Sequence, residues 1–83
     1  MLTDKEHVLK TFGLVIRELR QQHGLSGNEL AKRIGLKSPA HLYRIERGEI
    51  EPVLTTIQSI ATVFDMDFMS LINMAKQRVE KEN

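Results

Sequence analysis

The sequence predicts an all-α fold of five helices, and three observations support this. Apolar residues recur at three- and four-residue spacing along most of the 83 residues, which is typical of helices with one buried face. Capping residues and glycines separate these stretches at intervals that suit short helices. No alternation of apolar and polar residues is long enough for a strand. The length suits one domain, residues 1–83, with too little apolar surface for a second.

The first helix is expected from Thr3 to about His23. Thr3 and Glu6 can form a capping box, in which each satisfies a free amide of the other. Gly24 suits the position just past the helix end, where a left-handed backbone is needed. One arc of this helix should face the core, and it carries Leu9, Phe12, Ile16, Leu19 and Arg20.

The second helix is expected to begin after Ser26 and to reach about Ile34. Ser26 and Glu29 have capping-box spacing, and Gly35 can end the helix. The expected inward residues are Leu30, Ala31 and Ile34.

The third helix is expected over residues 39–47. Ser38 is a suitable N-cap, Pro39 suits the first helical position because no N–H is needed there, and Gly48 closes the helix. The inner arc holds Leu42, Ile45 and Glu46. The outer arc holds Pro39, Ala40, Tyr43, Arg44 and Arg47, with His41 at the edge of the inner arc.

After a loop at residues 49–52, the fourth helix is expected over about 54–64. Its inward residues should be Leu54, Ile57, Ile60, Ala61 and Phe64. Asp67 can cap the fifth helix, which should reach about Lys81. One face of that helix carries Phe68, Leu71, Ile72, Ala75 and Val79.

Charge is unevenly distributed along a chain whose net charge is only +1. Residues 17–47 hold seven basic side chains against three acidic ones, whereas residues 48–75 hold four acidic side chains and no basic one. Such asymmetry can direct one face toward phosphates. It also occurs in ordinary soluble domains, so the charge pattern alone leaves both interpretations open.

Several function classes find no support in the sequence. There is no cysteine, which excludes disulfides and cysteine-based metal or redox sites. No apolar run approaches the roughly 20 residues of a membrane span, and the N-terminus lacks the apolar core of a signal peptide. The expected location is therefore the cytoplasm, with no membrane partner.

The histidines and carboxylates do not form a catalytic or metal-binding pattern. His7, His23 and His41 lack metal-ligand spacing, and no nucleophile–base arrangement or phosphate-cradling loop is recognisable. We expect His7 to be exposed and His23 to pack near the end of the first helix. For His41, a phosphate contact and partial burial remain alternatives. We expect no enzyme activity, no cofactor, no metal and no small-molecule ligand.

A set of short motifs carries a family resemblance. In order, they are Phe12-Gly13-x-x-Ile16-Arg17-x-Leu19-Arg20, Gly24-Leu25-Ser26, Glu29-Leu30-Ala31, Ile45-Glu46-Arg47-Gly48, Pro52 and Ile60-Ala61. Together they resemble the lambda repressor-like (XRE-type) helix-turn-helix family over about residues 10–72. In size the chain is similar to restriction-modification controller proteins, small phage repressors and antitoxins, and we expect no separate ligand-binding domain.

The resemblance implies a five-helix transcriptional regulator that binds operator DNA, usually as a homodimer on a palindrome. The helix after Ser26 would lie across the DNA backbone, and helix 39–47 would enter the major groove. Whether such a regulator activates or represses is open.

The outer arc of helix 39–47 then provides the candidate base contacts. Arg44 is the strongest candidate, because a guanidinium can bond guanine O6 and N7 together. Tyr43 can touch a thymine methyl or a phosphate. Pro39 and Ala40 offer only apolar contact, so specificity would rest partly on DNA shape.

Phosphate contacts would position the domain on DNA. The expected contacts are side chains at Arg17, Lys37, Ser38, His41 and Arg47, with the amides near Asn28 at the start of the second helix.

Two further roles follow from the helix faces and the resemblance. Arg20 and Glu46 lie on inward arcs although both are charged, and a buried charge must be paired. The matching family positions form an ion pair between the first and third helices, which implies a structural Arg20–Glu46 pair. Spare apolar surface predicts a homodimer interface at Val63, Met69 and Met74.

The chain departs from the family pattern in three places. Gly27 stands where relatives commonly carry a Gln that braces the third helix. The turn 35–38 is one residue longer than usual, and Glu49 and Glu51 make the loop after the third helix acidic. These departures favour an alternative, a protein-interaction module that keeps the fold with weak or no DNA binding.

Overall fold

The computed structural model describes residues 4–82, and these residues form five helices and no strand. The helices are α1 (Asp4–Gln22), α2 (Gly27–Arg33), α3 (Pro39–Glu46), α4 (Leu54–Val63) and α5 (Phe68–Glu82). The predicted all-α class and the order of the five helices are confirmed. The expected capping role of Thr3 lies outside the described residues.

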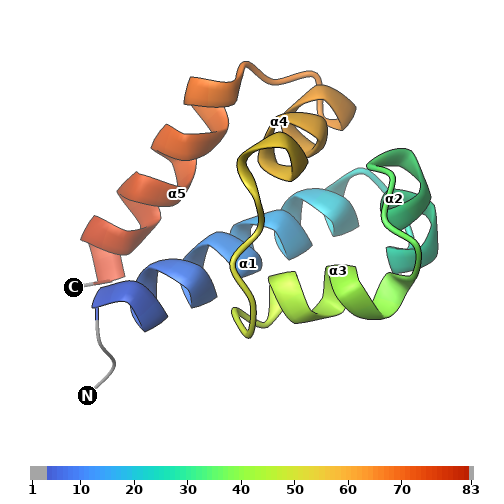
Figure 1. Ribbon diagram of the computed structural model, residues 1–83. Helices are drawn as coiled ribbons and strands as arrows, with labels where there is room; N and C mark the ends of the chain where they lie inside the picture. The colour runs from blue at the N-terminus through green and yellow to red at the C-terminus, as the bar shows by residue number, and fades with distance from the viewer. Residues whose placement is uncertain (1–3, 83) are drawn as a thin grey trace.

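The long helix α1 runs through the middle of the molecule (Figure 1). It packs against α3 on one side and against α5 on the other, and α2 packs on α3. The end of α5 returns to the same end of the molecule as the start of α1 (Figure 1). This arrangement leaves one side of α3 without a helix against it.

Every helix contributes to one hydrophobic core. The largest fully buried side chains are Ile16 from α1, Leu30 from α2, Leu42 and Ile45 from α3, Ile60 from α4 and Leu71 from α5. Burying a side chain of this size contributes about 1.5–3 kcal/mol. The five helices are therefore held together mainly by their shared core.

The capping box of α2 and the glycines after α2 and α3 lie where the sequence predicts them. Ser26 Oγ accepts a hydrogen bond from the Glu29 amide at 3.0 Å, and Glu29 accepts one from the Ser26 amide at 2.9 Å. Gly35 and Gly48 both have positive φ, 79° and 75°. Each lets the following amide bond back into its helix, as in Leu36 N–H to Ala31 O at 2.9 Å. Capping thus fixes the limits of the helix pair.

Three expectations about individual side chains are wrong or incomplete. Leu54 is 69% exposed rather than inward, because side chains in a first helical turn lean past the helix end. His7 is half-buried, and its Nε2 lies 3.4 Å from Val79 O because α5 runs beside α1. Ser38 occupies the N-cap position of α3 but makes no side-chain capping hydrogen bond.

Candidate nucleic-acid interface

The two faces of α3 have opposite character. Its inward face is buried and consists of Leu42, Ile45 and Glu46. Its other face is exposed at Ala40, His41, Tyr43, Arg44 and Arg47, with Pro39 half-buried. The exposure of His41 removes the alternative of partial burial. A helix with one face fixed in a core and the other open can meet a partner as a rigid element.

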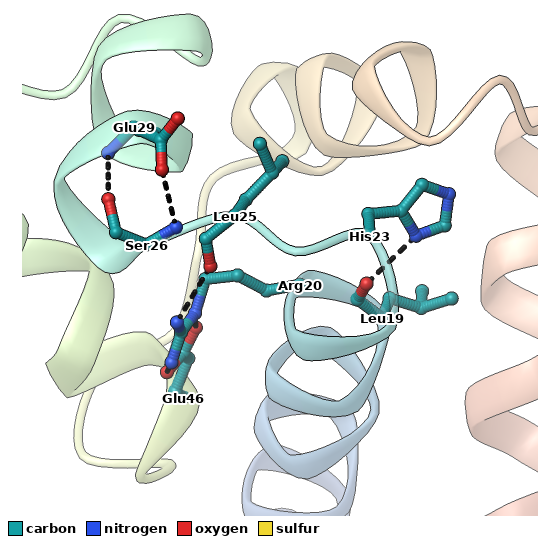
Figure 2. A network of polar contacts seen from close by, with 7 residues as sticks. All are labelled: Leu19, Arg20, His23, Leu25, Ser26, Glu29 and Glu46. Atoms are coloured by element: carbon teal, nitrogen blue, oxygen red, sulfur yellow. Dashed lines mark hydrogen bonds and ion pairs between the residues drawn. The ribbon is translucent and has the colours of Figure 1, made fainter.

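The inward face of α3 is tied to α1 by a buried ion pair (Figure 2). Arg20 donates from Nε and Nη2 to the Glu46 carboxylate at 2.7 and 3.1 Å, and its Nη1 donates to Leu25 O at 3.1 Å. The side chains are only 12% and 4% exposed. The hydrogen bonds to Glu46 raise the pKa of Arg20 above its ordinary value, so the guanidinium stays charged.

The outward face also contains a contact with α2 that the sequence did not reveal. The ring of Tyr43 covers Gly27, the first residue of α2. A Cβ atom at position 27 would overlap Oη, Cζ and Cε1 of that ring. The Arg20 guanidinium lies 5.9 Å from the ring centroid. Tyr43 is therefore held by two neighbouring helices while remaining 38% exposed.

Arg47 is already engaged by a neighbouring acid. Its Nε lies 2.5 Å from Glu49 Oε2, and Nη2 lies 3.3 Å from Oε1. These hydrogen bonds lower the pKa of Glu49, and the nearby charge of Arg44 adds to the effect. The pair is exposed, 56% and 51% for the two side chains. A phosphate would compete with Glu49 for Arg47.

The second acidic residue of this loop is also paired. Glu51 lies 3.8 Å from Lys5 at the start of α1, and both side chains are exposed. Both carboxylates that counted against DNA binding thus have a basic partner in the free protein.

The other expected contacts to DNA are free to meet a ligand. Arg17, Asn28, Lys37 and Ser38 are all exposed. Within residues 4–82, no ion pair or side-chain hydrogen bond holds Arg17, Lys37 or Arg44. Arg44 thus stands between exposed neighbours on α3 with its guanidinium unpaired.

The three residues expected at a dimer interface are not equivalent. Met69 and Met74 are 54% and 39% exposed. Val63 is half-buried and packs against the core, so it offers less exposed surface than the two methionines. The reason is that the last turn of α4 still lies over the core. Val53 and Leu54, which are 65% and 69% exposed, are apolar surface that the helix-face argument did not predict.

Three remaining features of residues 4–82 concern metal ligands, membrane-spanning helices and grooves. Residues 4–82 contain no group of three or more potential metal ligands. None of their helices is both long and apolar enough to cross a bilayer. An open apolar groove of about 580 Å³ lies between α1, α5 and the start of α4, and no α3 residue lines it.

Sequence comparison links this geometry to known proteins. The family described as Helix-turn-helix matches residues 16–71. The chain is 35% identical over 68 residues to the HTH-type transcriptional regulator SutR of Escherichia coli K12, covering 82% of this chain and 38% of SutR. It is 36% identical over 70 residues to the putative HTH-type transcriptional regulatory protein TK0539 of Thermococcus kodakarensis. That match covers 84% of this chain and 22% of the relative. The chain therefore spans well under half of either relative.

Solved structures share the fold. The restriction-modification controller protein C.AhdI of Aeromonas hydrophila is 36% identical, with a TM-score of 0.70 over 76% of this chain and 94% of that chain. The clp gene regulator ClgR of Corynebacterium glutamicum gives a TM-score of 0.82 at 21% identity. That likeness covers 90% of this chain and 79% of that chain, and it supports the fold alone.

Proposed function

Because the chain belongs to the helix-turn-helix family of DNA-binding transcriptional regulators, we propose that it binds operator DNA as a homodimer with α3 in the major groove. The observation that carries this proposal is the division of α3 into a fixed face and an open face. Core packing and the Arg20–Glu46 pair hold one side. Arg44 stands exposed and unpaired on the other. The helix can thus enter a groove without rearrangement.

Arg44 is the residue proposed to read a base. Its guanidinium has no ion pair to break within residues 4–82, and its fork geometry matches guanine O6 and N7. Pro39 and Ala40 would make apolar contacts near the start of α3, and Tyr43 would lie at the edge of the contact. Much of the remaining specificity would come from DNA shape.

Phosphate contacts would orient the domain on the duplex. We assign them to the exposed residues around α3 and on α1 and α2, namely Arg17, Asn28, Lys37, Ser38, His41 and Arg47. To contact a phosphate, Arg47 would have to give up its ion pair with Glu49. The loss of that pair lowers the net binding free energy gained from the phosphate contact. Binding should therefore depend strongly on salt, since each phosphate neutralised releases counterions.

The dimer is proposed to form through the exposed methionines of α5. Met69 and Met74 offer adaptable apolar surface there. Dimerisation would place two copies of α3 about one turn of DNA apart and raise affinity for a palindrome. Similarity to the transcriptional regulator SutR supports a role in transcription control. Sedimentation at tens of micromolar should show a dimer, and a monomer would contradict this part of the proposal.

A salt titration of DNA binding tests the proposed function as a whole. Fluorescence anisotropy with random duplexes should show binding at low salt that falls steeply as salt rises. The matched control is the variant Arg17→Ala with Arg44→Ala, which should bind much more weakly and with a shallower slope. No binding of wild type to any duplex at low salt would favour the alternative, a protein-interaction module with the same fold.

A further inference from the structure

Gly27 is a glycine for reasons of space rather than backbone conformation. It is buried at the start of α2, and its φ is not among the positive values found at Gly24, Gly35 and Gly48. Alanine would therefore fit the backbone and favour the helix. What excludes it is the Tyr43 ring, whose Oη, Cζ and Cε1 occupy the position of the missing Cβ.

Arg20 of α1 also contacts the ring. The Arg20 guanidinium lies 5.9 Å from the ring centroid, within the range of a cation–π contact. That guanidinium is itself fixed by Glu46 of α3 and by Leu25 O in the turn before α2 (Figure 2). Tyr43 therefore joins α2, α3 and, through Arg20, α1.

We propose that Tyr43 is a positioning residue. Its ring, seated on Gly27, sets how α3 stands against α2 and thereby directs the neighbouring Arg44 on DNA. The inference rests on the proposed function, since it concerns the same interface. It assigns Gly27 and Tyr43 as a size-matched pair in which the small residue makes room for the large one. The Tyr43 hydroxyl is then not a reader of a base.

The first test measures the ring directly in the free protein. Tyr43 is the only tyrosine and there is no tryptophan, so tyrosine emission reports on this ring alone. In Gly27→Ala, acrylamide quenching of the emission should rise toward its value in the unfolded chain. Lys32→Ala, an exposed control on α2, should leave quenching unchanged. Unchanged quenching in Gly27→Ala would overturn the pairing.

The second test is a double-mutant cycle on unfolding, which needs no DNA. Gly27→Ala should raise the melting temperature in a Tyr43→Ala background, because the space is then open and alanine favours the helix. In the wild-type background, Gly27→Ala should lower the melting temperature or raise it less. An equal shift in both backgrounds would overturn the pairing.

The third test separates positioning from base reading. Tyr43→Phe keeps the ring over Gly27, so it should bind DNA more tightly than Tyr43→Ala and should show no change of preference at any single base pair. Tyr43→Ala should weaken binding about tenfold, and by the same factor for the operator and for each of its single-base variants. A tenfold loss is within the usual range of coupling between contacting residues. In Gly27→Ala/Tyr43→Ala, stability should recover relative to Tyr43→Ala, whereas affinity should not.

The outcomes distinguish the two proposals. A change of preference at one base pair in Tyr43→Phe would make Tyr43 a base reader and overturn the positioning role. Wild-type affinity in the double variant would also overturn it. If wild type binds no duplex at low salt, the proposed function fails and the role on DNA fails with it. The quenching measurement and the double-mutant cycle on unfolding would still decide whether Gly27 and Tyr43 form a pair.

Discussion

Two arginine–glutamate pairs meet at the end of α3, and they differ in almost everything except chemistry. Glu46 points inward to Arg20, whereas the next residue, Arg47, points outward to Glu49. The inner pair is 12% and 4% exposed, and the outer pair is 56% and 51% exposed. The difference in burial therefore gives adjacent residues different roles. The inner pair holds α3 against α1, whereas Arg47 of the outer pair can exchange Glu49 for another anion.

A third pair lies between these extremes. Arg78 of α5 donates to the carboxylate of Glu18 on α1 at 2.8 and 2.9 Å. Their side chains are 33% and 39% exposed. Three pairs of the same chemistry thus form a series in exposure, and their contributions to stability should follow that series.

The largest effect is expected for Glu46→Ala. Removing this carboxylate leaves the Arg20 guanidinium partly buried without its partner, a change that costs about 3–5 kcal/mol. For a domain of this size each kcal/mol lowers the melting temperature by roughly 4–8 °C. Thermal unfolding followed by circular dichroism measures the shift. Glu49→Ala is the matched control, and an unchanged melting temperature in Glu46→Ala would remove the structural role of the pair.

The next effect concerns DNA binding rather than stability. Arg47→Ala should weaken binding similarly for all sequences, because a phosphate contact carries no base information. The slope of log affinity against log salt should become shallower by about 0.9 per lost contact in each protomer. Anisotropy titrations at several salt concentrations would measure it, and loss of preference at a single base pair would instead make Arg47 a base contact.

A smaller and pH-dependent effect is expected at Glu18. Hydrogen bonds from Arg78 hold the pKa of Glu18 below its ordinary value of 4.5. Its stabilising contribution is therefore complete above pH 4.5 and is lost as the pH falls through the lower pKa of the folded state. Urea unfolding should show Glu18→Gln less stable than wild type at pH 7, by about 0.5 kcal/mol after solvent screening. The difference should shrink on acidification, and a constant difference would contradict the assignment.

The smallest stability effect is expected for Glu49→Gln. The pair is exposed to solvent and screened by salt, so the melting temperature should stay close to that of wild type. Affinity for random duplexes should rise instead, because Arg47 is released and one negative charge is removed near DNA. A fall in affinity would show that Glu49 positions Arg47 rather than competing with phosphate.

Much of this arrangement could be predicted from local sequence. The Ser26–Glu29 capping box and the glycines after α1, α2 and α3 depend on neighbours within a few residues. The outward placement of Arg44 followed from helical periodicity alone. The Arg20–Glu46 contact needed the family resemblance as well, since periodicity placed both charges inward without pairing them.

What the sequence could not show depends on contacts between distant segments. The contact of His7 with Val79 joins residues 72 positions apart. Leu54 has a helical position that suits the core, yet it lies where the helix end extends into solvent. The sequence indicated only that Gly27 lacks the Gln side chain with which relatives brace the third helix. The position of the Tyr43 ring explains why a side chain is excluded there.

The proposed base reader on the outward face of α3 is Arg44. The most direct measurement selects bound sequences from a random duplex pool and then compares wild type with Arg44→Ala on the selected site and its single-base variants. Arg44→Ala should lose about 1–3 kcal/mol of discrimination at one base pair per half-site and little elsewhere. Uniform weakening at all positions, or no enrichment of any sequence by wild type, would contradict it.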